Sequence, residues 1–158
     1  MKSKCDYDSF FNLALRFLSF LPRSQAEVEA YLVKKGVSAS DLAKILQRLT
    51  ELNFINDEAF ARWWIARRRG DHPRGQRLIS LELKDKGVDK ELTASLLAES
   101  VKETDERSLA AKVAAKKAAK LRGLPEEEIR KKLYLTLAGR GFSGEVISET
   151  VAKILKKR

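Results

Sequence analysis

One stretch predicts most of the fold: ISLELKDKGV, residues 79–88. Ile79 and Leu83 lie four positions apart, which is the spacing of residues on one buried face of a helix. The glycine near its end stands where a helix commonly ends in a left-handed residue. The same pattern, a basic residue followed by glycine and an apolar residue, occurs again as KGV at residues 35–37 and RGF at residues 140–142. The sequence therefore contains one helical element three times.

The residues around the three glycines Gly36, Gly87 and Gly141 align at several further positions. A leucine stands four places before each glycine, and Val, Ile or Leu stands eight places before it. Leu, Leu and Val stand ten places after it, and the glycines are 51 and then 54 residues apart. Such self-similarity is typical of tandem repeats, whose neighbouring units cover one another's apolar faces.

Helical periodicity also fills the rest of each repeat. Ser24 with Glu27 three places later predicts a capping box at a helix start, and apolar residues recur at three and four along most of the chain. We therefore expect an all-α fold, an elongated tandem array of three three-helix repeats. The expected units are residues 1–55, 56–102 and 103–158.

Composition limits the classes of function. The 158 residues include 32 Lys and Arg against 22 Asp and Glu, a net charge of +10, which favours an anionic partner. One cysteine, Cys5, cannot form an internal disulfide, and one histidine, His72, is a poor basis for zinc or Ser-His chemistry. No apolar run is long enough to span a membrane. We expect a cytoplasmic protein that binds no membrane.

The densest basic stretch runs through residues 62–77 and adjoins Trp63 and Trp64. Arginine recognises phosphate and carboxylate groups through two hydrogen bonds at once, and exposed aromatic rings beside it can stack on bases of a single strand. Alternatively, the arginines form a solvated helix end. We expect at least one tryptophan to lie in a core. The candidate partner-binding arginines are Arg62, Arg67, Arg68, Arg69, Arg74 and Arg77.

A second basic set lies further along the chain and consists of Lys112, Lys116, Lys117, Lys120 and Arg122. Lys112, Lys116 and Lys120 are spaced by four and share one helix face, which is either a strip that contacts phosphates or a solvated face. We include these three lysines among the candidate partner contacts. The chain has no glycine-rich phosphate loop, and most acidic residues stand singly or at helix starts. We expect no catalytic, cofactor or metal site, and hence no enzyme.

Three quoted stretches resemble the RecX regulatory proteins: LTELNFINDEAFAR at 49–62, RRRG at 67–70 and RGQRLISLELKDKGV at 74–88. The closing RGF and the repeated helix triplets are also similar to that family. The resemblance implies a non-enzymatic protein that binds the RecA recombinase and its filament on single-stranded DNA. It implies mostly inhibition of filament growth, ATP hydrolysis and strand exchange, in DNA repair and the SOS response. We expect a monomer.

Other functions stay open at this point. The first is a direct single-stranded DNA-binding protein that acts without RecA, whose affinity for bare strands would fall steeply with salt. The second is a helical adaptor for another acidic protein. The third is a small nuclease, which would need carboxylates gathered at one point to hold metal ions.

Overall fold

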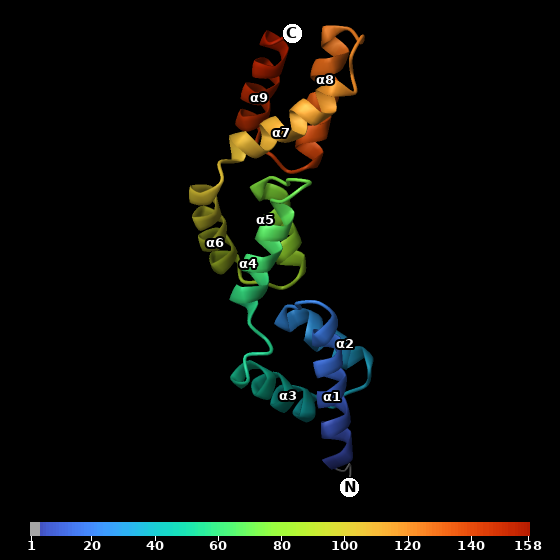
Figure 1. The fold of residues 1–158 in the computed structure, drawn as a ribbon. Helices are drawn as coiled ribbons and strands as arrows, with labels where there is room; N and C mark the ends of the chain where they lie inside the picture. The colour runs from blue at the N-terminus through green and yellow to red at the C-terminus, as the bar shows by residue number, and fades with distance from the viewer. Residues whose placement is uncertain (1–3) are drawn as a thin grey trace.

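The computed structural model describes residues 4–158, which form nine α-helices and no strand (Figure 1). They follow one another as three triplets, stacked along an elongated array with the first triplet at one end and the third at the other. The expected all-α tandem array is therefore confirmed. The helices are α1 Lys4–Phe20, α2 Gln25–Lys34, α3 Ala39–Glu51, α4 Asp57–Arg68, α5 Gln76–Asp85, α6 Lys90–Glu103, α7 Glu106–Ala119, α8 Glu126–Gly139 and α9 Gly144–Lys156.

Helix ends follow the local chemistry of the sequence. The predicted capping box is present at the start of α2, where the Ser24 side chain accepts the Glu27 amide and Glu27 accepts the Ser24 amide. The second helix of each triplet ends before a glycine with a positive φ of 73° to 89°, at Gly36, Gly87 and Gly141. Glycine adopts this conformation without a steric penalty. These glycines therefore turn the chain from the second helix of each triplet to its third.

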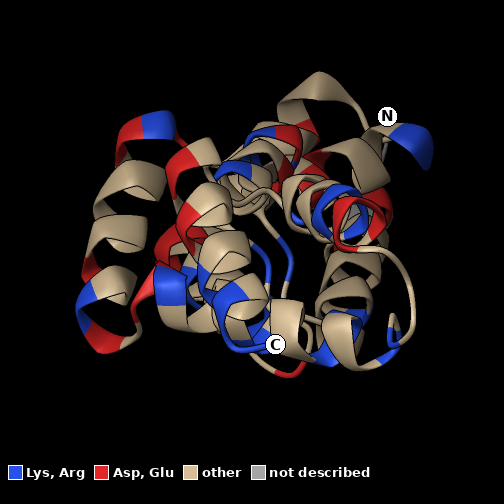
Figure 2. Ribbon diagram, turned by 90° about the horizontal axis from the view of Figure 1, so that it is seen from above, with Lys and Arg blue, Asp and Glu red and all other residues tan. Residues whose placement is uncertain are grey.

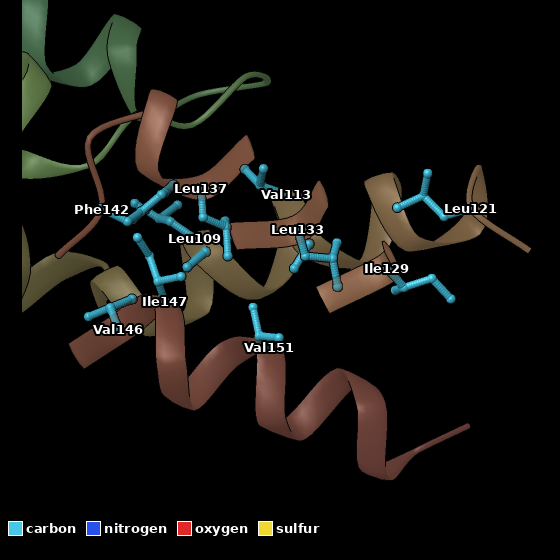
Figure 3. Packing of buried hydrophobic residues seen from close by; sticks show 12 residues of the cluster. Leu109, Val113, Leu121, Ile129, Leu133, Leu137, Phe142, Val146, Ile147 and Val151 are labelled. Atoms are coloured by element: carbon cyan, nitrogen blue, oxygen red, sulfur yellow. The ribbon is translucent and has the colours of Figure 1, made fainter. Parts of the chain in front are cut away.

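Each triplet has a hydrophobic core of its own. The first core centres on α1, α2 and α3, the second on α4, α5 and α6, and the third on α7, α8 and α9. Figure 3 shows the third core, in which Leu133 and Leu137 of α8 lie between side chains of α7 and α9. Trp63 and Trp64 are half-buried and pack against the second core. Three separate cores make each triplet a domain.

The first and second domains meet where α2 begins and α5 ends. The Ser24 hydroxyl donates to the Lys86 carbonyl at 2.6 Å, and the Lys86 ammonium donates to the Glu27 carboxylate at 2.7 Å. The Gln25 amide donates to the Asp57 carboxylate in the first turn of α4 at 2.8 Å. The start of α2, the second helix of the first triplet, thus contacts the end of α5, the second helix of the next triplet.

The second and third domains meet through an equivalent set of contacts. The Gly75 amide at the start of α5 donates to the Arg140 carbonyl at the end of α8 at 2.8 Å. The Gln76 amide donates to the Glu106 carboxylate in the first turn of α7 at 2.7 Å. Because both joints use the same positions, α8, α5 and α2 stack end to end in one direction (Figure 1).

The linkers between triplets lie near the expected domain boundaries. The first linker, between α3 and α4, contains the expected boundary after residue 55. The expected boundary after residue 102 falls just before the last residue of α6, since that helix ends at Glu103. The two boundaries stay predictions.

Candidate partner-binding cleft

Two adjoining hollows open at the joint between the second and third domains. The first, of about 560 Å³, lies between the loop at residues 70–73 and the exposed side of α7. Its charged lining residues are Asp71, Lys112, Lys116, Lys117, Lys120 and Arg140. It therefore brings the predicted lysine strip beside the loop that follows the arginine-rich helix.

The second hollow, of about 870 Å³, lies on the other side of the same loop. Arg67 and Arg68 from the end of α4 and Arg74 from the loop line it. Asp71, His72 and Arg140 line both hollows, so the two are continuous. We call them together the basic cleft. Both basic and acidic segments are spread over the ribbon (Figure 2), whereas the lining of the basic cleft contains eight Lys and Arg residues and one acidic residue, Asp71.

Backbone contacts hold the loop that separates the two hollows. The Arg74 amide donates to the Arg68 carbonyl at 2.9 Å, which closes the loop on the end of α4. Pro73 and Gly75 are buried against the third domain, and the Arg140 guanidinium donates to the Pro73 carbonyl at 3.5 Å. The loop is thus fixed to both domains, and the cations around it keep a defined spacing.

One carboxylate organises the arginines of the second hollow. Glu82 on α5 accepts from Arg68 at 2.9 Å, from Arg74, and from the Trp64 indole at 2.9 Å. The Arg68 guanidinium also lies 4.2 Å from the centre of the Trp64 ring. Both arginines are therefore held in place and partly neutralised.

The other cations of the cleft differ from these two. Within residues 6–158, no ion pair is formed by Arg67 or by the lysines of α7 and its C-cap, which are Lys112, Lys116, Lys117 and Lys120. Arg67 instead lies 5.6 Å from the centre of the Trp63 ring. Arg67 and Lys112 are exposed, as are Lys116 and Lys120. Their charges are therefore available to an anionic partner.

Three predicted contact residues lie outside the cleft. Arg62 pairs with Glu99 at 2.7 Å and Glu58 at 3.1 Å, and these hydrogen bonds raise the pKa of its guanidinium. Arg77 is exposed on α5 and lines a different hollow. Arg69 points away from the cleft residues and has a structural role, because it contacts Ser100 and Thr104.

Arg69 joins the end of α4 to the end of α6. It donates to the Ser100 hydroxyl at 3.1 Å and to the Thr104 carbonyl at 2.9 Å. Burial lowers the pKa of its guanidinium, while the charges of Glu106 and Asp105 act in the opposite direction. These contacts fix the segment after α6, which links the second domain to the third.

The structure thus gathers six of the nine predicted cations in one cleft, namely Arg67, Arg68, Arg74, Lys112, Lys116 and Lys120. The list of predicted contacts did not include Lys117 or Arg140. Lys117 belongs to the second basic set of the sequence, and Arg140 stands in the RGF segment, which aligns with KGV in the other two repeats. Their positions were visible in the sequence, but their convergence on the cleft was not.

The described part of the chain contains neither a candidate metal cluster nor a helix suited to a membrane. No three His, Cys, Asp or Glu side chains within residues 6–158 lie close enough together to hold a metal ion. No helix within residues 4–158 combines the length and apolar character that crossing a membrane requires. His72 lies at the surface of the cleft.

Three-helix domains in tandem, each with its own core, define a helical-repeat protein. The chain belongs to the RecX family of regulatory proteins. Residues 11–49, 56–97 and 104–151 match the family models described as the first, second and third three-helix domains of RecX. Each range overlaps one of the three helix triplets, and the resemblance seen in the sequence is confirmed.

Individual relatives agree with this assignment. The regulatory protein RecX of Mycolicibacterium smegmatis is 34% identical over 145 residues, which cover 89% of this chain and 77% of the relative. That of Chlorobaculum tepidum is 37% identical over 142 residues, or 90% of this chain and 86% of the relative. The crystal structure of RecX from Lactobacillus salivarius superimposes with a TM-score of 0.83 at 24% identity, covering 99% of this chain and 100% of that one. The last match supports the fold.

Proposed function

We propose that this protein regulates RecA in the cytoplasm by binding RecA and its filament on single-stranded DNA. Binding restrains filament growth, ATP hydrolysis and strand exchange, and so tunes DNA repair and the SOS response. The observation that carries the proposal is the basic cleft, where cations from two domains converge around one loop. Membership of a family of regulatory proteins supports it.

The mechanism follows from the shape of the array and the place of the cleft. An elongated array can lie along a filament groove and contact neighbouring RecA subunits with different domains (Figure 1). A ligand shifts an equilibrium only by its difference in affinity for the two states. Tighter binding to a filament that is capped or strained therefore slows growth and hydrolysis.

Direct binding to single-stranded DNA without RecA is the alternative. The tryptophans give it little support, because both pack against the second core and Arg67 and Arg68 lie over their rings. The alternative predicts inhibition only when the protein coats the DNA. It also predicts an affinity for bare strands that falls steeply as salt rises.

The test is single-strand-dependent ATP hydrolysis by RecA, with this protein added at substoichiometric amounts. We expect the triple variant Lys112→Gln, Lys116→Gln, Lys120→Gln to need about tenfold more protein for the same inhibition, since each exposed charge pair contributes about 0.5 kcal/mol. The control variant carries Gln at Lys153, Lys156 and Lys157, which removes the same charge outside the cleft and should inhibit normally. Equal inhibition by the two variants would contradict a role for the cleft. No inhibition by the wild-type protein would contradict the proposed function.

A further inference from the structure

The basic cleft continues into a third hollow of different character. This hollow, of about 260 Å³, lies beside the junction of α5 and α8 and shares Leu78 and Gly139 with the cleft. Its remaining lining is mainly apolar: Leu81, Tyr134, Ala138, Phe142 and Ile147, with Arg77 and glycines. We call this hollow the apolar end, and the basic cleft together with it the joint groove.

The apolar end exposes two large side chains from two different domains. Leu81 of α5 is 58% exposed and Tyr134 of α8 is 48% exposed. Each lines the same hollow, whose floor contains the buried Phe142. Exposed apolar side chains gathered around a hollow and rimmed by charge are a usual sign of a binding site for a partner's apolar anchor.

We propose that the joint groove binds an extended acidic peptide segment of a partner protein. Carboxylates of that segment pair with Arg67 and the α7 lysines, and one large apolar side chain of it lies in the apolar end. Arg77 at the rim pairs with a carboxylate next to this anchor. The inference rests on the proposed function, since it names what the basic cleft contacts there: protein rather than DNA.

The charges of the groove favour a peptide over a nucleic acid. Asp71 lines both hollows of the basic cleft, and Glu82 already accepts hydrogen bonds from Arg68 and Arg74. A nucleic-acid strand presents a phosphate at every nucleotide and would meet these carboxylates. A peptide can place neutral residues opposite them.

The shape of the apolar end gives the same preference. Single-strand binders stack successive bases on exposed aromatic rings. Here the walls are largely aliphatic, formed by Leu78, Leu81 and Ala138. Of the two aromatic residues in this lining, Phe142 is only 1% exposed and Tyr134 alone is exposed, so successive bases have no series of rings to stack on. Aliphatic walls suit a side chain such as Leu or Phe, whose burial depends on apolar area.

The test measures fluorescence anisotropy with three synthetic probes of equal net charge. The first is a short peptide of Glu and Gly with one central Phe, the second has Ala in place of Phe, and the third is an oligothymidylate. We expect the wild-type protein to bind the Phe peptide about tenfold more tightly than the Ala peptide. Equal affinity for the two peptides, no measurable binding of either, or tighter binding of the oligothymidylate would overturn the inference.

Two variants locate the anchor. The double variant Leu81→Ala, Tyr134→Ala should lose the preference for Phe, whereas Leu135→Ala should keep it. Leu135 is a matched control because it is 61% exposed on the same α8 helix and does not line the groove. All three positions are exposed, so the variants should fold. A double variant that still prefers the Phe peptide would refute the site.

RecA assays separate the two proposals. If the wild-type protein inhibits RecA hydrolysis through its lysines but does not distinguish the peptides, the inference fails and the proposed function stands. If it distinguishes the peptides through Leu81 and Tyr134 but does not inhibit RecA, the peptide site stands and the proposed function fails.

Discussion

Gly141 and Gly123 allow the close packing between the second and third domains to be tested separately from the strain of left-handed backbone. Both lie in the third domain and have nearly the same left-handed φ, 84° and 86°. A Cβ at Gly141 would lie 2.3 Å from the Leu78 Cβ and 2.5 Å from the Leu78 nitrogen, whereas a Cβ at Gly123 would meet nothing within 4 Å. The two alanine variants therefore share the conformational strain and differ in the clash.

The magnitudes follow from these distances. Left-handed backbone costs an ordinary residue about 1–2 kcal/mol, and Gly123→Ala should show this loss alone. Gly141→Ala should lose about a further 1–3 kcal/mol, because the backbone nitrogen of Leu78 cannot move aside as a flexible side chain would. For a chain of this size the extra loss corresponds to an unfolding midpoint roughly 2–12 °C below that of Gly123→Ala.

The assay is thermal unfolding followed by far-ultraviolet circular dichroism, at one protein concentration and scan rate. Gly75→Ala supplies a second arm, because Gly75 has an ordinary φ of −75° and its Cβ would lie 2.3 Å from the Gly141 carbonyl oxygen. It should destabilise through the clash alone. Equal midpoints for Gly141→Ala and Gly123→Ala would refute the close packing of this joint.

Two further predictions concern Glu27, at the joint between the first and second domains, and Arg69, between the ends of α4 and α6. Burial alone would raise the pKa of the Glu27 carboxyl, but hydrogen bonds from Lys86 and the Ser24 backbone, with the nearby positive charges, lower it below its ordinary 4.5. Its stabilising effect is thus present above about pH 4.5 and lost as pH falls through the lower folded value. Urea unfolding should therefore give Glu27→Gln a lower free energy of unfolding than wild type at pH 7, and this difference should shrink below pH 4.5. A difference that does not change with pH would contradict the reasoning. Arg69→Ala should lower the free energy of unfolding by about 2 kcal/mol, because two hydrogen bonds are lost. The folded variant should still inhibit RecA. An unchanged free energy of unfolding would contradict the structural role of Arg69.

The repeated helices could be predicted because their signals are local. A leucine four places before each of Gly36, Gly87 and Gly141 reflects one helix turn, and capping depends on residues three places apart. The contact of Gly75 with Gly141 could not be predicted, because 66 positions separate them. Only the stacking of two folded domains brings them together.

The candidate site was predictable in composition but not in arrangement. Clusters of arginine and lysine are visible in the sequence, and six of the predicted cations line the basic cleft. The pairing of these cations could not be predicted, because it depends on how α5 and α6 pack against α4. Glu82 of α5 contacts Arg68 and Arg74, and Arg69 contacts Thr104 after α6. The apolar end was missed because Leu81 and Tyr134 lie on different domains.

The end-to-end stacking of α8, α5 and α2 has an electrostatic consequence. The aligned peptide dipoles of a helix place a partial positive charge at its N-terminus and a partial negative charge at its C-terminus. At each joint the end of one helix meets the start of the next, so their opposite partial charges compensate each other, in addition to the side-chain contacts of Glu27 with Lys86 and of Glu106 with the Gln76 amide. The two outer ends of the column have no neighbouring helix end among residues 4–158 that these contacts join, and charged side chains lie there: Glu126–Glu128 at the start of α8 and Lys34 and Lys35 at the end of α2. Each inner helix end is therefore compensated by the next helix, and each outer end by side chains of opposite charge.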